Sequence, residues 1–375
     1  MSKPAPTRIG FIGSGFARRV QLPALAFVPD AKAVAIASGH VANAESVARE
    51  FGIARVYDDG EELARSDDVD LVIVSSTPDT HARYAIAALE AGKHVLCEKP
   101  MAIDADEASQ MVATSAQHPD RIAWIDHELR YEPNRRRAHE LIRSDAIGEL
   151  RHIELSLKPY LRGDGRPQTS DAPWNWWFDA SRGGGILGAV GSHLIDLCRF
   201  WSGSEITYVA GLAETFIRQR KDAAGKVRPV TADDFASCVL RSASGAVATI
   251  TLSTVAHHGD GHMGQVTGSD GTLRLTGETK LELGKAGGPL EDISAPDDLT
   301  ATMRPNNMWA RSFVRLLRDM VRVIGGGLAE GEPATFHDGL QVQRVLDAVR
   351  AGQGAGAGAG ARARAGAGAR GVQLD

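Results

Sequence analysis

The stretch RIGFIGSGFARRVQLPAL, residues 8–25, decides the fold because it joins a strand, a tight glycine turn and a helix. It predicts a strand over 8–12, a turn at Gly13 and Gly15, and a helix over 16–27. Gly13 can adopt the positive φ that such a turn requires. Gly15 lacks the Cβ that would hold a phosphate away from the backbone. The first N–H groups of the helix and its positive dipole end would then face the anion.

The dinucleotide fingerprint continues with Gly or Ala three positions after Gly15, where this chain has Arg18. Arg18 could place a cation beside the phosphates, or it could be a solvated arginine on the helix surface. Because Gly-x-Gly also occurs in ordinary turns, the interpretation depends on the strand–helix alternation that follows. The cofactor-binding residues expected in this turn are Gly13, Ser14, Gly15, Phe16, Ala17 and Arg18.

The first third of the chain alternates between short apolar runs and helical patterns. Strands are expected over 8–12, 33–38, 71–75, 94–97 and 121–125, and helices over 16–27, 43–51, 61–66, 80–91 and 105–115. This alternation predicts the α/β class, with a doubly wound parallel sheet in a dinucleotide-binding domain over residues 1–126. Ligands of such sheets bind at the carboxyl ends of the strands.

Two of these strand ends indicate chemistry. After the second strand, Ser38 and His40 stand where an Asp or Glu would bind a ribose 2′-hydroxyl, so NADP is favoured over NAD. Both residues could instead have no part in selectivity. After the fourth strand, CEKP places Lys99 where its ammonium could stabilise an oxygen that gains negative charge. Lys99 could also be an ordinary surface lysine.

Composition bounds the remaining possibilities. The chain has 375 residues, 43% of them hydrophobic and 24% charged, with a formal net charge of −5. This is ordinary for a soluble globular protein of two domains and argues against nucleic-acid or membrane-surface binding. The three distant cysteines indicate no metal site and a reducing cytoplasm. We expect neither a signal peptide nor a membrane span.

Successive strands predict an antiparallel sheet in a substrate domain over 127–350. They are expected over 151–157, 206–214, 236–241, 246–255, 262–267 and 272–275, and helices over 132–142, 186–201, 306–324 and 337–350. From 351 to 375 the chain is a low-complexity tail rich in Gly, Ala and Arg, which we expect to be flexible.

The helix expected over 186–201 carries a second chemical signal. His193 and Asp196 are three residues apart and therefore neighbours on its surface, so an imidazole acid/base could be oriented by a carboxylate. A lone histidine on a helix is also often a core residue. Upstream, the aromatic run at 174–178, which includes Trp176, could wall a sugar or nicotinamide pocket, fill a domain interface or pack in the core.

Together these motifs make the chain resemble the Gfo/Idh/MocA family of nicotinamide-dependent sugar and polyol oxidoreductases, from about residue 8 to 350. The resemblance rests on GSGFARRVQLPAL (13–25), STPDTH (76–81), AGKHVLCEKPMA (91–102), GGGILGAVGSHLIDLCRFW (183–201) and ATFHDGLQVQRVLDAV (334–349). It implies an N-terminal Rossmann domain and a C-terminal α/β domain with a large, mostly antiparallel, open-faced sheet often used in oligomer contacts.

The resemblance also implies roles for single residues. Lys99 would lie near nicotinamide and substrate, and His193 would be the acid/base. Thr77, Pro78, His81 and Glu98 would fall on the family's nucleotide-binding positions. Ser38 and Ser76, which stand at strand ends, and Lys99 complete the expected cofactor-binding residues. Many members have an Asp four residues before the motif histidine, where this chain has Ala189. Asp196 or Arg130 would then anchor the substrate.

The sequence thus predicts hydride transfer between NADP or NAD and a secondary alcohol carbon of a sugar, sugar lactone or polyol. Lys99, His193 and Asp196 would be catalytic, and a homo-oligomer (dimer or tetramer) is expected. The candidate substrate-binding residues are Lys99, Arg130, Tyr160, Trp176, His193 and Asp196. The alternatives are a non-catalytic cofactor-binding regulator and an NAD-dependent glycoside-cleaving enzyme.

Overall fold

A computed structural model describes residues 5–158, 171–354 and 371–374. The chain separates into two compact units. The first contains residues 1–132 and 297–340, and the second contains 133–296 and 341–375. Residues 297–340, which the sequence analysis assigned to the substrate domain, thus belong to the first unit.

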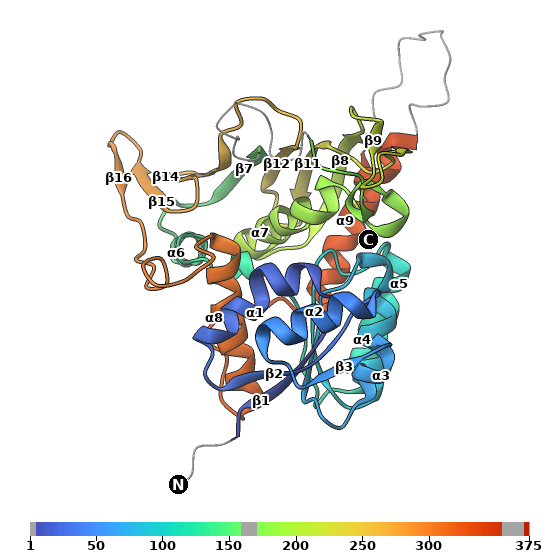
Figure 1. Cartoon of the computed structure of the whole chain (residues 1–375). Coiled ribbons are helices and arrows are strands. Elements are labelled where there is room, and N and C mark those ends of the chain that lie inside the picture. Colours follow the sequence, from blue (N-terminus) through green and yellow to red (C-terminus); the bar gives the residue numbers. More distant parts are fainter. Residues whose placement is uncertain (1–4, 159–170, 355–370, 375) are drawn as a thin grey trace. The chain divides into compact units, whose positions relative to one another are not determined.

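The first unit is built on a parallel sheet whose six strands in the described residues have the order β3-β2-β1-β4-β5-β6. Figure 1 labels β1, β2 and β3 of this sheet. The strands are β1 Thr7–Ile12, β2 Ala31–Ala37, β3 Arg55–Tyr57, β4 Leu71–Val74, β5 His94–Cys97 and β6 Ala123–Ile125. This confirms the predicted doubly wound sheet. Only the short β3 was not expected, because its three residues are too few to produce a recognisable apolar run.

Helices cover both faces of this sheet, which is why its strands are continuous apolar runs. Ile9, Phe11 and Ile73 point to one face and Ile12, Val72 and Val74 to the other. The first face is covered by η1 Ala17–Gln21, α1 Leu22–Ala24, η2 Leu25–Phe27, α2 Val41–Phe51 and α8 Met308–Ile324. The second is covered by α3 Gly60–Arg65, α4 His81–Glu90, α5 Ala105–Gln117 and the start of α9 Phe336–Gly354.

The segment after the glycine turn is not the continuous α-helix predicted over 16–27. It begins with the π-helical turn η1, continues through the short α1 and ends in the 3₁₀ turn η2. Pro23 lies in this segment and has no N–H to donate to the preceding turn, which weakens a regular ladder here. The wide turn places Gln21 in the interior, at the carboxyl ends of the strands.

The second unit contains a sheet whose nine strands in the described residues have the order β16-β15-β14-β13-β7-β12-β11-β8-β17. β7 and β12 run parallel, and the other paired strands run antiparallel. The strands are β7 Leu150–Lys158, β8 Ile206–Glu214, β11 Phe235–Ser242, β12 Val247–Ser253, β13 Gly261–Gly268, β14 Gly271–Thr276, β15 Lys280–Lys285, β16 Leu290–Asp292 and β17 Val372–Gln373. The expected antiparallel sheet is therefore mixed but mostly antiparallel, and the α/β class is confirmed.

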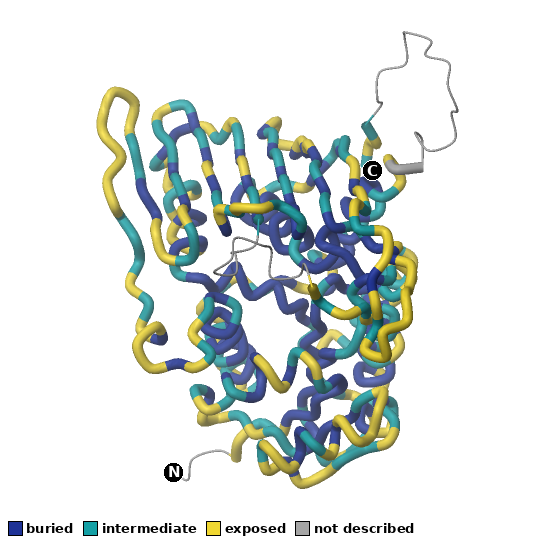
Figure 2. Tube along the Cα trace, turned by 45° about the horizontal axis from the view of Figure 1, so that its top comes forward, coloured by how far each residue is buried: buried dark blue, intermediate teal, exposed yellow. Residues whose placement is uncertain are grey.

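Alternate residues of β11 and β12 are buried, and Figure 2 shows such changes of colour along the strands of the sheet. α6 Pro133–Arg143 packs on α7 Ser192–Ser202, and α7 packs on β7 and β12. On the other face Leu212 and Val239 are 44% and 42% exposed. A separate hairpin joins β9 Gln219–Lys221 to β10 Val227–Pro229. The remaining short turns are η3 Pro78–Thr80, η4 Glu128–Tyr131, η5 Trp176–Phe178, η6 Ala180–Arg182 and η7 Leu187–Gly191.

The predicted flexible tail is only partly described. Its first residues continue α9 to Gly354, and β17 pairs with β8 near the end of the chain. Residues 355–370 lie outside the described residues. No helix in the part of the chain that the structure describes is long and apolar enough to cross a membrane.

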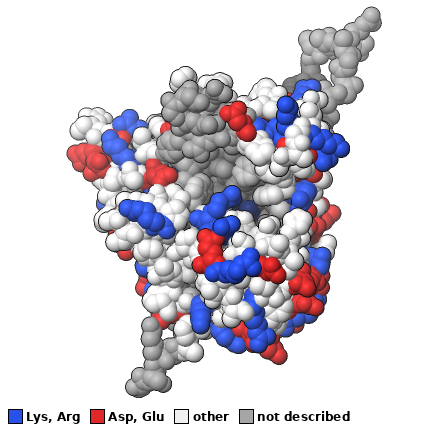
Figure 3. Space-filling model, viewed as in Figure 1, with Lys and Arg blue, Asp and Glu red and all other residues white. Residues whose placement is uncertain are grey.

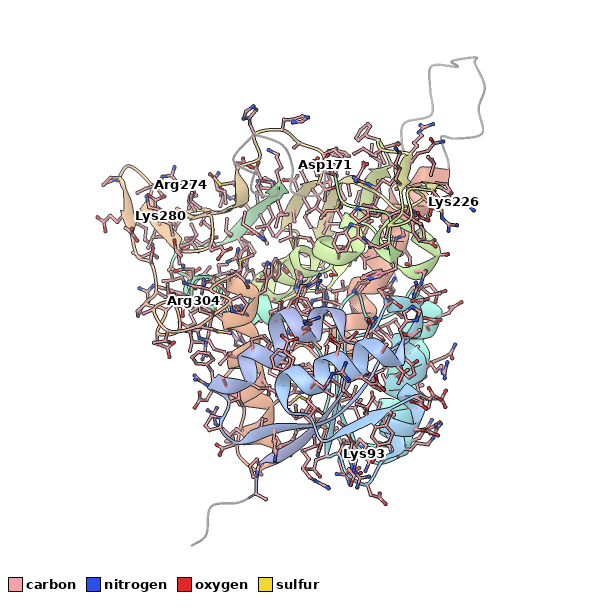
Figure 4. All side chains as sticks on the ribbon, viewed as in Figure 1. Lys93, Asp171, Lys226, Arg274, Lys280 and Arg304 are labelled. Carbon is pink, nitrogen blue, oxygen red and sulfur yellow. The ribbon has the colours of Figure 1, made fainter. Side chains whose placement is uncertain are left out.

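Charged side chains of both signs are interspersed on the face shown in Figure 3, in keeping with the small net charge. On the second unit, Arg274 of β14 and Lys280 of β15, both labelled in Figure 4, form ion pairs with Glu282. The Arg274–Glu282 pair crosses from β14 to β15, whereas Lys280 and Glu282 both lie on β15.

The glycine turn yields a stability prediction. Gly13 has φ +112°, and an added Cβ would lie 2.2 Å from the carbonyl oxygen of Ser75. Gly13→Ala should therefore lower the free energy of unfolding by about 2 kcal/mol or more, measured by urea denaturation. Gly15→Ala is the matched control, because nothing lies within 4 Å of its Cβ position. Equal stability of the two variants would contradict this account.

Candidate functional site

The glycine turn lies at the carboxyl edge of the parallel sheet, held between the ends of β2 and β4. The N–H of Gly13 donates to the carbonyl of Ala37 at 2.8 Å, and the N–H of Ser75 donates to the carbonyl of Ile12 at 2.7 Å. Space is open at the Cβ position of Gly15, so a ligand can reach the backbone there. These features fit the pyrophosphate of a dinucleotide, since the turn leads directly into the first helical segment.

The end of β2 is tied to this turn by a side-chain hydrogen bond. The hydroxyl groups of Ser14 and Ser38 are 2.9 Å apart. Arg18 does not point freely into solvent, because its Nε lies 2.6 Å from a carboxylate oxygen of Glu50 on α2. The pair is half exposed, so its strength is modest and salt-dependent.

The loop after β4 is ordered by its own polar side chains. Thr80 donates its hydroxyl to Ser76 Oγ at 2.7 Å and to the carbonyl of Thr77 at 2.8 Å. His81 is buried, with Nδ1 3.0 Å from the carbonyl of Pro100 and Nε2 3.3 Å from that of Ser76. Burial lowers the pKa of His81 to about 4, so the imidazole is neutral and its single N–H donates to one of these two carbonyls, while the ring packs between the loops after β4 and β5.

Lys99 follows β5 and has a side chain that is only 15% exposed. Its Nζ lies 5.9 Å from the ring centroid of Phe16 and 6.0 Å from that of Trp309 on α8. Glu98 Oε2 is 4.0 Å from the same ammonium. Two aromatic faces and one carboxylate therefore position the cation. Trp309 was missed by sequence reasoning, because no local signal connects it with a loop about 200 residues earlier in the chain.

A buried polar cluster lies next to Lys99. The side-chain amide of Gln21 donates to Glu98 Oε1 at 2.9 Å and to Asp126 Oδ2 at 3.4 Å. Its carbonyl oxygen accepts from the hydroxyl of Ser75 at 2.8 Å. Glu128, from η4, belongs to the same electrostatic group. We call Gln21, Glu98, Asp126 and Glu128 the carboxyl cluster.

Burial controls the protonation of the carboxyl cluster. It raises the pKa of Glu98, and it raises the pKa of Asp126 well above the ordinary aspartate range. It raises the pKa of Glu128 to about 8, against the opposing effect of Lys99. Sequence analysis identified Glu98 but neither Asp126 nor Glu128, which follow β6 in a stretch without a recognisable motif.

In the second unit, the glycines before α7 allow a close chain approach. A Cβ on Gly184 would lie 2.4 Å from the carbonyl oxygen of Trp177, and one on Gly185 would lie 2.3 Å from Asp233 Oδ1. The carboxylate of Asp233 accepts from the N–H of Leu187 at 2.7 Å. The predicted helix thus begins as the π-turn η7 and becomes α-helical at Ser192.

His193 and Asp196 are both buried on α7. Asp196 Oδ1 lies 3.8 Å from Nη1 of Arg199, which also pairs with Glu205 at 2.6 Å. Asp196 therefore has a cation beside it, in addition to its helical neighbour His193. Ala189 is buried in η7, so a methyl group stands in the interior at the position where the resemblance led us to look for a carboxylate.

The other candidate substrate residues are distributed between the two units. Arg130 is buried in the first unit, with Nη2 3.1 Å from Asp338 Oδ1. Trp176 lies in η5 of the second unit, and its ring is 6.1 Å from that of Trp177. Tyr160 lies outside the described residues. Within residues 5–158, 171–354 and 371–374, no group of three or more His, Cys, Asp or Glu side chains could hold a metal ion.

The raised pKa of Glu128 predicts a pH effect on stability. A carboxyl group with a raised pKa in the folded state stabilises the fold at low pH, and this is lost as pH rises from about 4.5 through about 8. Between pH 5 and 9 the free energy of unfolding should therefore fall by roughly 4 kcal/mol more in the wild type than in Glu128→Gln. Urea denaturation at several pH values measures this, with the exposed Glu90→Gln as the control. Identical pH slopes for wild type and Glu128→Gln would be incompatible with this assignment.

Comparisons with known proteins agree with this architecture. Residues 7–127 match the model of the oxidoreductase family with an NAD-binding Rossmann fold, and residues 135–274 match the GFO/IDH/MocA C-terminal domain. An uncharacterized oxidoreductase of Synechocystis is 30% identical over 80% of this chain and 81% of its own length. The levoglucosan dehydrogenase of Pseudarthrobacter phenanthrenivorans is 30% identical over 73% of this chain and 75% of its own.

A solved levoglucosan dehydrogenase in complex with NADH and levoglucosan has the same fold. Its TM-score is 0.79 at 24% identity, over 92% of this chain and 96% of that chain. The two family models cover most of the chain, and the expected motifs lie within them: the glycine turn, the strand end with Lys99 and the helix with His193. The chain belongs to the Gfo/Idh/MocA family of oxidoreductases.

Proposed function

We propose that this protein transfers a hydride between NAD(P) and a secondary alcohol carbon of a sugar, sugar lactone or polyol. The observation that carries the proposal is the environment of Lys99, a cation positioned at the carboxyl end of β5 by two aromatic rings and Glu98. The glycine turn at the same edge of the sheet supports cofactor binding. The levoglucosan dehydrogenase relatives support a sugar-like substrate.

When bound, the nicotinamide would accept the hydride that leaves the alcohol carbon. The hydroxyl proton of the alcohol would pass to the imidazole of His193, so the C–H and O–H bonds break and a carbonyl forms. The ammonium of Lys99 would donate a hydrogen bond to the substrate oxygen and stabilise its developing charge. Asp196 would orient His193 or bind a substrate hydroxyl, and Arg130, Trp176 and Tyr160 would contribute to substrate binding.

For the cofactor, we propose NADP in preference to NAD. The segment after β2 carries Ser38 and His40 and no carboxylate that would repel a 2′-phosphate. The exposed apolar side chains of Leu212 and Val239 on the open sheet face support self-association as a dimer or tetramer. The buried free thiols of Cys97, Cys198 and Cys238 are compatible with a reducing cytoplasm.

Substitution of the two proposed catalytic groups tests the role assignment. Lys99→Met and His193→Ala should each lower kcat by about 10²–10⁴-fold, because each removes a group that acts on the reacting oxygen. Cofactor binding, measured by quenching of intrinsic fluorescence, should persist. Lys93→Met is the matched control, since Lys93, labelled in Figure 4, precedes β5, whereas Lys99 follows this strand in the sequence. Near-normal turnover in both test variants would reject these roles.

A substrate screen distinguishes the proposal from its two alternatives. Absorbance of the reduced nucleotide should change with NADP or NAD and at least one member of a panel of sugars, sugar lactones and cyclitols. Cofactor binding without turnover on any member would indicate a regulator. Tightly held NAD, release of free sugar and no net reduction would indicate a glycoside-cleaving enzyme.

Cofactor preference is tested at Ser38. Ser38→Asp adds a carboxylate after β2, which should lower kcat/KM with NADP at least about tenfold relative to NAD, through repulsion of the 2′-phosphate. Ser38→Asn is the neutral control of similar size and should have a much smaller effect on the ratio. If Ser38→Asp leaves the ratio of kcat/KM with NADP to kcat/KM with NAD unchanged, the 2′-phosphate does not bind next to residue 38.

A further inference from the structure

We propose that Asp126 is a positioning residue that stays protonated at neutral pH and donates its proton to Glu98, so that the ionised carboxylate is the one facing Lys99. The inference concerns the carboxyl cluster, which lies entirely within the first unit. Its catalytic consequence rests on the proposed role of Lys99, whereas the protonation state itself does not.

The orientation of Gln21 supports one shared proton. Because its carbonyl oxygen accepts from the hydroxyl of Ser75, its NH₂ group must face the carboxyl groups. It donates at 2.9 Å to Glu98 but only at 3.4 Å to Asp126. Both carboxyl groups accept from the one NH₂ group of Gln21, so their oxygens lie close together and a proton on one of them can be shared with the other. Two ionised carboxylates at such a distance in the interior would repel strongly.

The surrounding donors favour Glu98 as the ionised partner. Glu98 Oε2 accepts from the backbone N–H of Lys99 at 3.2 Å and lies 4.0 Å from its ammonium. Its Oε1 accepts the short bond from Gln21. Asp126 is fully buried, and its Oδ1 has no hydrogen-bond partner among the described residues. Burying an oxygen of an ionised carboxylate without a hydrogen bond costs far more free energy than burying an oxygen of a neutral carboxyl group. The proton therefore belongs on Asp126.

The titratable and charged groups around Asp126 lead to the same distribution. Glu98 and the thiol of Cys97 face it from the end of β5, Glu128 faces it from η4, and Lys99 supplies the cation. Burial and the two glutamates raise the pKa of Asp126, and Lys99 opposes them only in part. With Asp126 neutral, the charge of Glu98 is balanced by Lys99, and the ammonium is held toward the carboxyl edge of the sheet.

Infrared spectroscopy of the full chain tests the protonation state without any need for activity. The spectra are recorded at pH 7, where Glu128, whose pKa is about 8, is mostly protonated in both proteins and cancels in the difference. The difference spectrum of wild type minus Asp126→Asn should therefore show the C=O stretch of a protonated carboxyl group. The matched control is Glu128→Gln, which keeps Asp126, so its spectrum should retain the band that Asp126→Asn loses. A difference spectrum that shows only carboxylate bands would overturn the proposal.

The positioning role is tested by rescue. Asp126→Leu removes the donor to Glu98 and should lower kcat roughly tenfold or more, as expected when a catalytic group is misplaced. Asp126→Asn keeps a neutral donor of the same shape and should recover most of that loss, with the pH profile of kcat unchanged. An Asn variant as impaired as the Leu variant, or a shifted pH profile, would show that the acid itself is needed in its ionised form.

The two experiments distinguish a failure of the inference on Asp126 from a failure of the proposed function. If the protein turns over no sugar or polyol, the kinetic arm fails together with the proposed function, yet the infrared band still decides whether Asp126 is protonated. If turnover is found and Lys99→Met abolishes it while the band is absent, the proposed function stands and the inference on Asp126 is wrong.

Discussion

The contact between Gly13 and the backbone of Ser75 is the constraint on which the first unit depends. Any side chain at position 13 would overlap the carbonyl oxygen of Ser75, so β1 and β4 can end side by side only with glycine there. This approach lets Ile12 and Ser75 extend the ladder beyond the strands and brings the loops after β1, β2 and β4 to one edge. The same edge receives Lys99 at the end of β5 and Asp126 after β6.

The chemistry of that edge follows from burial. The acidic side chains of the carboxyl cluster lie near Lys99 and are buried. Burying all of them in the ionised form would cost a large amount of free energy. Hydrogen bonds from Gln21 and the nearby cation let one negative charge persist, while raised pKa values neutralise the others. The irregular segment η1 makes this possible, since its wide turn delivers Gln21 to the interior.

In the second unit, two glycines and one aspartate fix the start of the helical segment that carries His193. Gly184 and Gly185 let the chain pass against Trp177 and Asp233, and Asp233 then caps the helical segment that carries His193. Packing of α7 against β7 and β12 supports this helix from the broad sheet. A capped and buried helix, rather than a flexible loop, therefore fixes the backbone at His193.

The local order of residues was enough to predict the parallel sheet and the glycine turn. It also predicted that Lys99 follows a strand of this sheet and that His193 lies on a helix. Apolar runs, glycine turns and Gly-x-Gly are short-range signals that depend on neighbours within a few residues. Only the tertiary structure decided that Trp309 stands beside Lys99, that Arg18 pairs with Glu50 and that Gln21 donates to both Glu98 and Asp126. These contacts join residues distant in the sequence, and a buried carboxyl group changes its protonation only once the fold has removed the water around it.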